Sequence, residues 1–429
     1  MKIKKILCYL FPVWVIILLF SSCSRTEPDL FDKSAAERLN ESVENIVDLL
    51  CSAENGWVFN YFPNNDTEGY TYIMKFSPYY KVTMAALNKY VPKYTESESD
   101  WDVIGDMGPV LTFNTYNDIF HLFADPMAPG ASEADGVGLN GDYEFLVLSK
   151  TNDVIILKGK KHAAITIARR LPVEKDWKEY LTQIETLDCS LFGAIFPQLF
   201  LQMEDSKYIL TEGHTHIFNV VPEEGNPIDD LEYWPFIVTE YGIYLVNPFK
   251  SGELSAQQFV LNEDKTALVD VENSLITIIP EPIEDFVTTT PSKYFATLDD
   301  LGGEFLTMFN KMADEFKTRY SGRRDLSSIG FRIDDGRFEF ILKSAANEAT
   351  FAVPYEISSG QITILPFDGD NMDEGDMNNN ASLFYGAIAS IKEMLALIQG
   401  TFELSCDEPF SYNTIKYAKS SSDYLVVKR

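Results

Sequence analysis

Two closely spaced histidines are the first residues of this chain whose type and spacing could support chemistry. His214 and His216 are separated by one residue, and Glu212 precedes them at the same interval. Alternate side chains of a strand point to the same face, so two imidazoles and a carboxylate on such a face could bind a transition metal. The chain holds four histidines and no HExxH motif. A metal site at His214 and His216 and a plain polar strand face therefore both fit the spacing.

Carboxylates gather in a second segment, residues 368–380 (DGDNMDEGDMNNN). Hard cations such as Ca²⁺ prefer several oxygen ligands, but the EF-hand template requires glycine where Asp373 stands. We interpret the segment as a solvated acidic loop with at most opportunistic Ca²⁺ binding. The chain also lacks the GxSxG, Walker A and SxxK motifs. A hydrolase would therefore have to use carboxylates dispersed along the sequence.

A glycine-rich stretch matches the dinucleotide-binding expression at Gly136, Gly138 and Gly141. In that motif the glycines follow a strand and open a helix. Here a loop rich in alanine, proline and glycine (125–141) comes first, and a strand pattern follows. We interpret the stretch as a hairpin connection, and no cofactor is predicted.

The ligand-binding candidates are an aromatic segment and a basic cluster. Residues 111–126 (LTFNTYNDIFHLFADP) are dense in aromatic side chains, and residues 158–162 (KGKKH) form a local basic cluster in an acidic chain. Aromatic rings pack cores by default, but they also line clefts that bind sugars or peptides. The lysines could pair with an anionic group or lie on an exposed turn. The candidate set is Phe113, Tyr116, Phe120, Phe123, Lys158 and Lys160.

The N-terminus indicates where the protein resides. Three lysines precede an apolar run of 15 residues (6–20), which is shorter than the roughly 20 that a spanning helix needs and is typical of a secretory signal peptide. Ser21, Ser22 and Cys23 resemble the lipobox of bacterial lipoproteins, in which the cysteine thiol is lipidated and becomes the mature N-terminus. The resemblance implies that Cys23 is the lipidation site and that residues 1–22 are removed.

Composition excludes several function classes. The chain has 429 residues, is 45% hydrophobic and 13% aromatic, and carries a net charge of −30, which is globular rather than disordered composition. An acidic surface disfavours nucleic acid and anionic lipid as partners, because both require a basic face. Apart from Cys8 and Cys23, the cysteines are Cys51, Cys189 and Cys406. Three widely spaced thiols do not predict a disulfide scaffold.

The hydrophobic periodicity predicts an α+β fold, predominantly antiparallel β-meanders with a few packed helices. Helices are expected from Ser34 up to a stop at Asn55-Gly56 and at 173–187, 298–320 and 381–398. Strands of period two fill most of the remainder, including 119–123. The predicted organisation is a signal peptide (1–22), a lipidated cysteine with its tether (23–33), an N-terminal α+β domain (34–205), a central β-rich segment (206–290) and a C-terminal α+β domain (291–429).

Several stretches together resemble one family. They are residues 29–39 (DLFDKSAAERL), 52–62 (SAENGWVFNYF), 108–117 (GPVLTFNTYN) and 141–145 (GDYEF). The chain is similar here to an uncharacterised lipoprotein family of Bacteroidetes, classed as a domain of unknown function. The resemblance implies an accessory protein of SusC/SusD-type outer-membrane nutrient uptake. The family has no established catalytic residues, so none is transferred to this chain.

The expected function is that of a membrane-anchored, non-enzymatic lipoprotein of the outer membrane, at the cell surface or on the periplasmic leaflet, which binds a glycan or peptide nutrient. One alternative is a structural or docking subunit of an envelope complex. A third is a hydrolase with dispersed carboxylates. The expected partners are the outer membrane through the lipid, SusC/SusD-type transporter components and a glycan or peptide ligand, but no nucleic acid.

Overall fold

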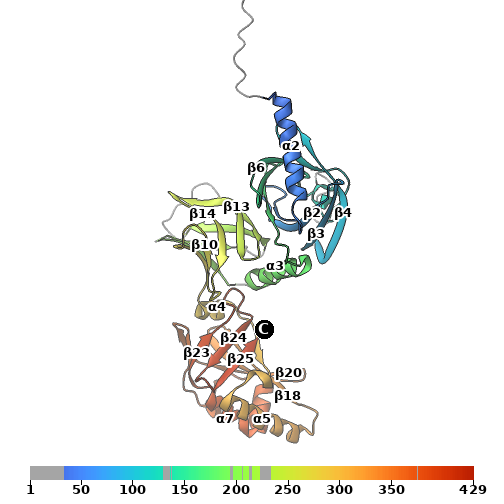
Figure 1. Cartoon of the computed structure of the whole chain (residues 1–429). Coiled ribbons are helices and arrows are strands. Elements are labelled where there is room, and N and C mark those ends of the chain that lie inside the picture. The colour runs from blue at the N-terminus through green and yellow to red at the C-terminus, as the bar shows by residue number, and fades with distance from the viewer. Residues whose placement is uncertain are drawn as a thin grey trace, which may run out of the picture.

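The computed structural model describes residues 33–128, 136, 138–193, 197–204, 206–211, 215–222, 233–373 and 375–429. The predicted signal peptide, Cys23, the tether up to residue 32, Glu212 and His214 lie outside the described residues. The α+β class is confirmed, because antiparallel sheets dominate and helices pack on them. Two closed barrels and one open sheet follow one another along the chain (Figure 1). No helix of the described part is long and apolar enough to cross a membrane.

The first unit is an eight-stranded barrel in which each strand pairs with the next and β8 pairs back with β1. Successive side chains of a strand point to opposite faces, which explains the core of this barrel. Trp57, Phe59 and Tyr61 of the first strand lie in the interior cluster, whereas Val58 belongs to a separate cluster outside the barrel. The strands are β1 (Trp57–Tyr61), β2 (Tyr70–Phe76), β3 (Lys81–Asn88), β4 (Val91–Gly105), β5 (Pro109–Phe113), β6 (Glu144–Lys150), β7 (Val154–Gly159) and β8 (Ile165–Arg170).

Two helical segments complete the first barrel. Helix α2 (Ala35–Cys51) begins with a capping box between Ser34 and Glu37, as the sequence predicts, and buries Ile46 and Leu50 in the barrel core. The strand predicted at 119–123 is wrong, because the chain forms a short 3₁₀ helix there, η1 (His121–Ala124). Asn117 begins this turn, because its side chain and its carbonyl accept hydrogen bonds from the backbone N–H groups of the residues that follow. Such local bonds use N–H groups that a strand would offer to its neighbour.

The second unit is also an eight-stranded barrel, closed by the pairing of β16 with β9. Its first two strands form a hairpin in which Met203 pairs with Ser206, so the predicted boundary between residues 205 and 206 falls inside that hairpin. The strands are β9 (Leu199–Met203), β10 (Ser206–Thr211), β11 (Ile217–Pro222), β12 (Tyr233–Val238), β13 (Gly242–Ser251), β14 (Leu254–Leu261), β15 (Leu268–Asp270) and β16 (Ile276–Pro280).

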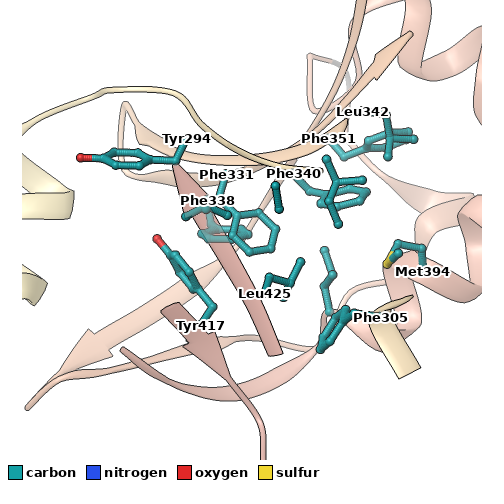
Figure 2. Close-up of a cluster of buried hydrophobic side chains, with 14 of the residues drawn as sticks. Tyr294, Phe305, Phe331, Phe338, Phe340, Leu342, Phe351, Met394, Tyr417 and Leu425 are labelled. Atoms are coloured by element: carbon teal, nitrogen blue, oxygen red, sulfur yellow. The ribbon is translucent and has the colours of Figure 1, made fainter. Parts of the chain in front are cut away.

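The third unit is a nine-stranded sheet with helices packed on it, in the strand order β20-β19-β18-β17-β25-β24-β23-β22-β21. Figure 2 shows part of its core, where aromatic rings of the sheet such as Phe331 and Phe340 lie near helix residues Phe305 and Met394. The single helix predicted at 381–398 is interrupted at Ile388, whose backbone is extended. The sheet strands are β17 (Tyr294–Ala296), β18 (Leu326–Asp334), β19 (Arg337–Ser344), β20 (Asn347–Val353), β21 (Tyr355–Ser358), β22 (Gln361–Ile364), β23 (Gly400–Ser405), β24 (Thr414–Ala418) and β25 (Tyr424–Lys428). The helices are α4 (Ile283–Thr289), η3 (Leu298–Asp300), α5 (Gly303–Tyr320), η4 (Gly369–Asn371), α6 (Asn379–Ala387) and α7 (Ala389–Leu397).

Helix α3 (Trp177–Phe192) joins the two barrels (Figure 1). Near its start Tyr180 and Leu181 pack on the outside of the first barrel, and towards its end Leu191 and Phe192 enter the core of the second. The barrels also meet directly, because the Gly69 N–H donates to the carbonyl of Phe236 at 3.0 Å. A side chain at Gly69 would have its Cβ only 2.7 Å from Ile237, so this approach requires glycine.

An ion-paired histidine crosses the same junction. The His216 ring lies between two carboxylates, with Nδ1 at 3.2 Å from Glu68 of the first barrel and Nε2 at 2.8 Å from Asp188 of α3. Lys89 also pairs with Glu68. Burial alone would lower the pKa of His216, but its hydrogen bonds to Asp188 and Glu68 raise that pKa to about 9. The histidine is therefore charged at neutral pH and ties three elements together.

This network predicts a pH dependence of stability. Because the folded state holds the His216 proton more tightly than the unfolded state, the stabilisation is fully present below pH about 6.5 and is lost as the pH rises through about 9. Between these values we expect the free energy of unfolding to fall by up to about 1.4 kcal/mol per pH unit. Urea unfolding followed by tryptophan fluorescence at several pH values measures the slope. His216→Gln should remove it and His162→Gln should retain it; an unchanged slope in His216→Gln would contradict the assignment.

Candidate functional site

A large hollow lies where α3, the second barrel and the third unit meet. Its volume is about 650 Å³, within the 300–1,000 Å³ range of ligand pockets, which occur preferentially at domain interfaces. One wall is the face of α3 that carries Thr182, Thr186 and Ser190. A second wall is the end of β14 at Leu261, and Phe410 of the third unit contributes the third. We refer to this hollow as the junction pocket.

Local hydrogen bonds fix the wall formed by α3. The carboxylate of Asp176 caps the helix by accepting the N–H of Glu179 at 2.9 Å. At the next residue, the indole N–H of Trp177 donates to the backbone carbonyl of Asn55 at 3.0 Å, and the Asn55 amide donates to two carbonyls just before the helix. The start of α3 is therefore held on the first barrel, which orients its hydroxyl face towards the pocket.

The loop between β23 and β24 supplies the wall from the third unit. Phe410 is 2% exposed and packs into the core cluster of the second barrel. Beside it, the Tyr412 hydroxyl donates to the carbonyl of Glu281 at 2.7 Å, and the Tyr294 hydroxyl donates to the carbonyl of Tyr412 at 2.8 Å. The Tyr412 ring also stacks on Phe286 at 4.6 Å. These contacts anchor the loop to Glu281, which follows the last strand of the second barrel, and to Tyr294 in the sheet of the third unit.

The chemistry of the junction pocket suits binding. The half-buried Leu187 and Leu261 give it an apolar floor, beneath which Leu191 and Phe410 are buried. The hydroxyls of Thr182, Thr186 and Ser190 donate to carbonyls of their own helix, so they present acceptor lone pairs outwards. Charged side chains of both signs line the pocket, and among the described residues none of them forms an ion pair: Asp176, Lys178, Glu179, Lys265 and Glu408. Its lining contains three carboxylates but neither histidine nor cysteine.

Comparison with protein families places the chain. A family model described as a domain of unknown function, DUF4302, matches residues 27–263, more than half of the chain. The chain belongs to the DUF4302 family. No curated protein matches it. One similar solved structure, the β subunit of DNA polymerase from Streptococcus pyogenes, is 8% identical and covers 90% of this chain and 97% of that chain. Its TM-score is 0.14, so the likeness carries no argument about fold or function.

In this DUF4302 protein the predicted aromatic cleft is corrected to a core. Phe113, Phe120 and Phe123 are 1–2% exposed and lie inside the first barrel. The ring of Tyr61 contacts two of them, at 5.0 Å from Phe120 and 5.4 Å from Phe123 between centroids. Rings buried on all sides pack against each other and have no face free for a ligand. Tyr116 alone is exposed, at 58%, and its hydroxyl donates to Asp125 at 3.0 Å.

The predicted basic candidates and His216 also lie apart from the junction pocket, and His214 lies outside the described residues. Lys158 is exposed on β7, and Lys160 forms ion pairs with Asp106 and Glu144 on the first barrel. In His216 both ring nitrogens face carboxylates, which leaves neither free for a metal. No group of three potential ligands suited to a metal ion occurs among the described residues, which exclude His214. Cys51, Cys189 and Cys406 are free thiols.

Sequence reasoning missed every residue of the junction pocket. Its lining comes from three segments that are far apart in the chain, and only the pairing of strands and the docking of Phe410 bring them together. One local signal was present in α3. Thr182, Thr186 and Ser190 recur at intervals of four, apart from the apolar residues Tyr180, Leu181 and Leu191 that pack on the barrels, which marks a face that neither barrel covers.

The corrected core is testable by a pair of variants of neighbouring aromatic residues. Phe120→Ala removes a fully buried ring and should lower the free energy of unfolding by about 3–5 kcal/mol. Tyr116→Ala alters an exposed ring and should cost less than about 1 kcal/mol. Denaturant unfolding measures both. A Phe120→Ala cost as small as that of Tyr116→Ala would show that Phe120 is not part of the core.

Proposed function

We propose that this DUF4302 protein is a membrane-anchored, non-enzymatic binding protein of the cell envelope that holds short apolar peptides in the junction pocket. The observation that carries the proposal is the pocket itself: about 650 Å³, an apolar floor, and unpaired charges of both signs around it. A peptide offers the matching groups, because it has apolar side chains, backbone N–H donors for the helix hydroxyls, and termini of opposite charge.

The lining favours a peptide over a glycan. Sugar recognition relies on exposed aromatic faces, and the one aromatic residue of the lining, Phe410, is 2% exposed. Leucine side chains and hydroxyls instead suit an apolar side chain attached to a backbone.

The anchor and the partners follow from the N-terminus and the family. A lipidated Cys23 would tether the barrels by the segment up to residue 33, and the body would carry a net charge near −33 once the three lysines of residues 1–22 are removed. Such a charge keeps a protein solvated beside an anionic membrane. The resemblance to Bacteroidetes lipoproteins supports a place next to SusC/SusD-type transporters, to which a bound peptide would be handed.

A panel of three probes tests the ligand class. We expect a tetraleucine peptide to raise the melting temperature of the full-length protein in mild detergent by a few degrees at saturating concentration, since a ligand at 100 times its Kd stabilises by about 2.7 kcal/mol. Dodecanoate and maltotetraose should give smaller shifts. A shift with maltotetraose alone would refute the peptide assignment, and no shift with any probe would favour the docking-subunit function.

A matched pair of tryptophan substitutions tests the location. Thr186→Trp places a large ring in the junction pocket at an exposed helix position, and peptide affinity should fall at least about tenfold. Thr307→Trp is the control, because Thr307 is also exposed, and both hydroxyls donate to the carbonyl four residues earlier. Titration calorimetry compares the peptide affinities of the two variants. Equal affinities would show that the peptide does not bind in the junction pocket.

The anchor is tested by Cys23→Ser. The thiol is the atom that would be acylated, so the variant should lose incorporation of labelled palmitate and should no longer fractionate with membranes. Cys51→Ser, which removes a thiol of the folded body, should retain both properties. Membrane fractionation of Cys23→Ser that matches the unsubstituted protein would contradict the lipoprotein assignment.

A further inference from the structure

A second cavity lies between the outer walls of the two barrels. Its volume is about 240 Å³, below the range typical of drug-sized ligands, so it suits a molecule about the size of one sugar ring. Asn60 of β1 and Arg169 of β8 line one wall, Tyr244 of β13 and Gln258 of β14 line the other, and Tyr180 of α3 contributes from the helix. We refer to it as the inter-barrel cavity.

The alternation of strands turns these side chains outwards. On the first barrel Trp57 and Phe59 belong to the interior cluster, whereas Val58, which pairs in register with Arg169, belongs to an outer one. On the second barrel Tyr244 pairs in register with Gln258, while their neighbours Ile243 and Phe259 are in the core. Both walls are thus built from regular, paired strands, which hold side chains more precisely than loops do.

Arg169, one of the two arginines that line this cavity, has no partner of its own. Its neighbour Arg170 donates to Ser52 at 2.9 Å, ion-pairs with Asp153 at 3.6 Å and lies over the Trp57 ring. Among the described residues Arg169 forms neither an ion pair nor a side-chain hydrogen bond, although it is half-buried. A guanidinium offers five N–H donors in a fork that fits a carboxylate. A half-buried guanidinium without a partner is therefore a receptor for an anionic group.

The other polar groups can bind hydroxyls. Asn60 is 6% exposed, and no side-chain hydrogen bond engages its amide or that of Gln258 among the described residues. Burial raises the pKa values of Tyr180 and Tyr244, so both phenols stay protonated and neutral. The acid of the lining, Glu240, forms an ion pair with Lys175 at 3.7 Å. The cavity thus holds one guanidinium without an ion pair, together with amide and phenol groups.

We propose that the inter-barrel cavity binds a small carboxylate that also carries hydroxyl groups, of the hexuronate class. The carboxylate pairs with Arg169, and the hydroxyls bond to the amides of Asn60 and Gln258 and to the tyrosine hydroxyls. This site is separate from the junction pocket and does not rest on the proposed peptide function.

Titration calorimetry on the full-length protein in mild detergent tests the site with three probes. D-glucuronate carries both the carboxylate and the hydroxyls, D-glucose carries hydroxyls alone, and acetate carries the carboxylate alone. We expect D-glucuronate to bind at least about tenfold more tightly than either of the others, because only D-glucuronate makes both the charged and the hydroxyl hydrogen bonds. Undetectable binding of D-glucuronate at millimolar concentrations, or equal binding of acetate, would overturn the proposal.

Variants of both walls locate the binding. Arg169→Gln should weaken D-glucuronate binding about tenfold or more, Arg169→Lys should weaken it less because the charge remains, and Gln258→Ala should weaken it from the opposite barrel. The control Arg323→Gln removes one positive charge from an exposed position on the third unit and should change nothing.

Two further measurements separate this site from the junction pocket and from misfolding. Thr186→Trp should leave D-glucuronate binding intact, since Thr186 lines only the junction pocket of the two. Melting temperatures show which variants are folded. If Arg169→Gln is unstable, Gln258→Ala still tests the site from the opposite wall. Full D-glucuronate affinity in a folded Arg169→Gln or Gln258→Ala protein would refute the assignment.

Discussion

The packing of α3 against two barrels at once is the interaction on which the rest of the structure depends. Ile184 contacts the clusters of both barrels, so one helix buries apolar surface on two sides. Each buried aliphatic side chain contributes about 1.5–3 kcal/mol, whereas the ionic contacts around His216 mainly fix the relative placement of the barrels. Both cavities exist because this helix holds the barrels at a fixed separation and leaves its third face uncovered.

The local elements could be predicted from the sequence, but the closure of the sheets could not. Period-two alternation revealed most strands, and Ser34 with Glu37 marked the start of the first helix, because these signals lie within a few residues of each other. Closure depends on pairs such as Trp57 with Arg170 and Ile276 with Met203. Such pairs join distant residues that carry no complementary pattern, so two barrels were predicted only as meanders.

For the site residues too, local features could be predicted from the sequence and long-range contacts could not. Aromatic density pointed to Phe113, Phe120 and Phe123, but composition alone cannot separate a cleft from a core, since both concentrate rings. The residues that do line cavities, such as Thr186 and Arg169, are ordinary members of a helix and a strand. Their significance comes from what faces them across a junction. His216 was predicted as a metal ligand, but its ring nitrogens face Glu68 and Asp188, which belong to other elements and could not be inferred from the sequence.

The closure of the second barrel has a consequence for where the chain can be divided. The family match ends at residue 263, just beyond β14, whereas β15 and β16 complete the barrel by pairing with β14 and β9. A fragment cut at the family boundary would expose two strand edges with unsatisfied N–H and C=O groups, which are templates for aggregation. The unit of sequence similarity is thus shorter than the unit of folding, and β16 extends the smallest self-contained piece to at least residue 280.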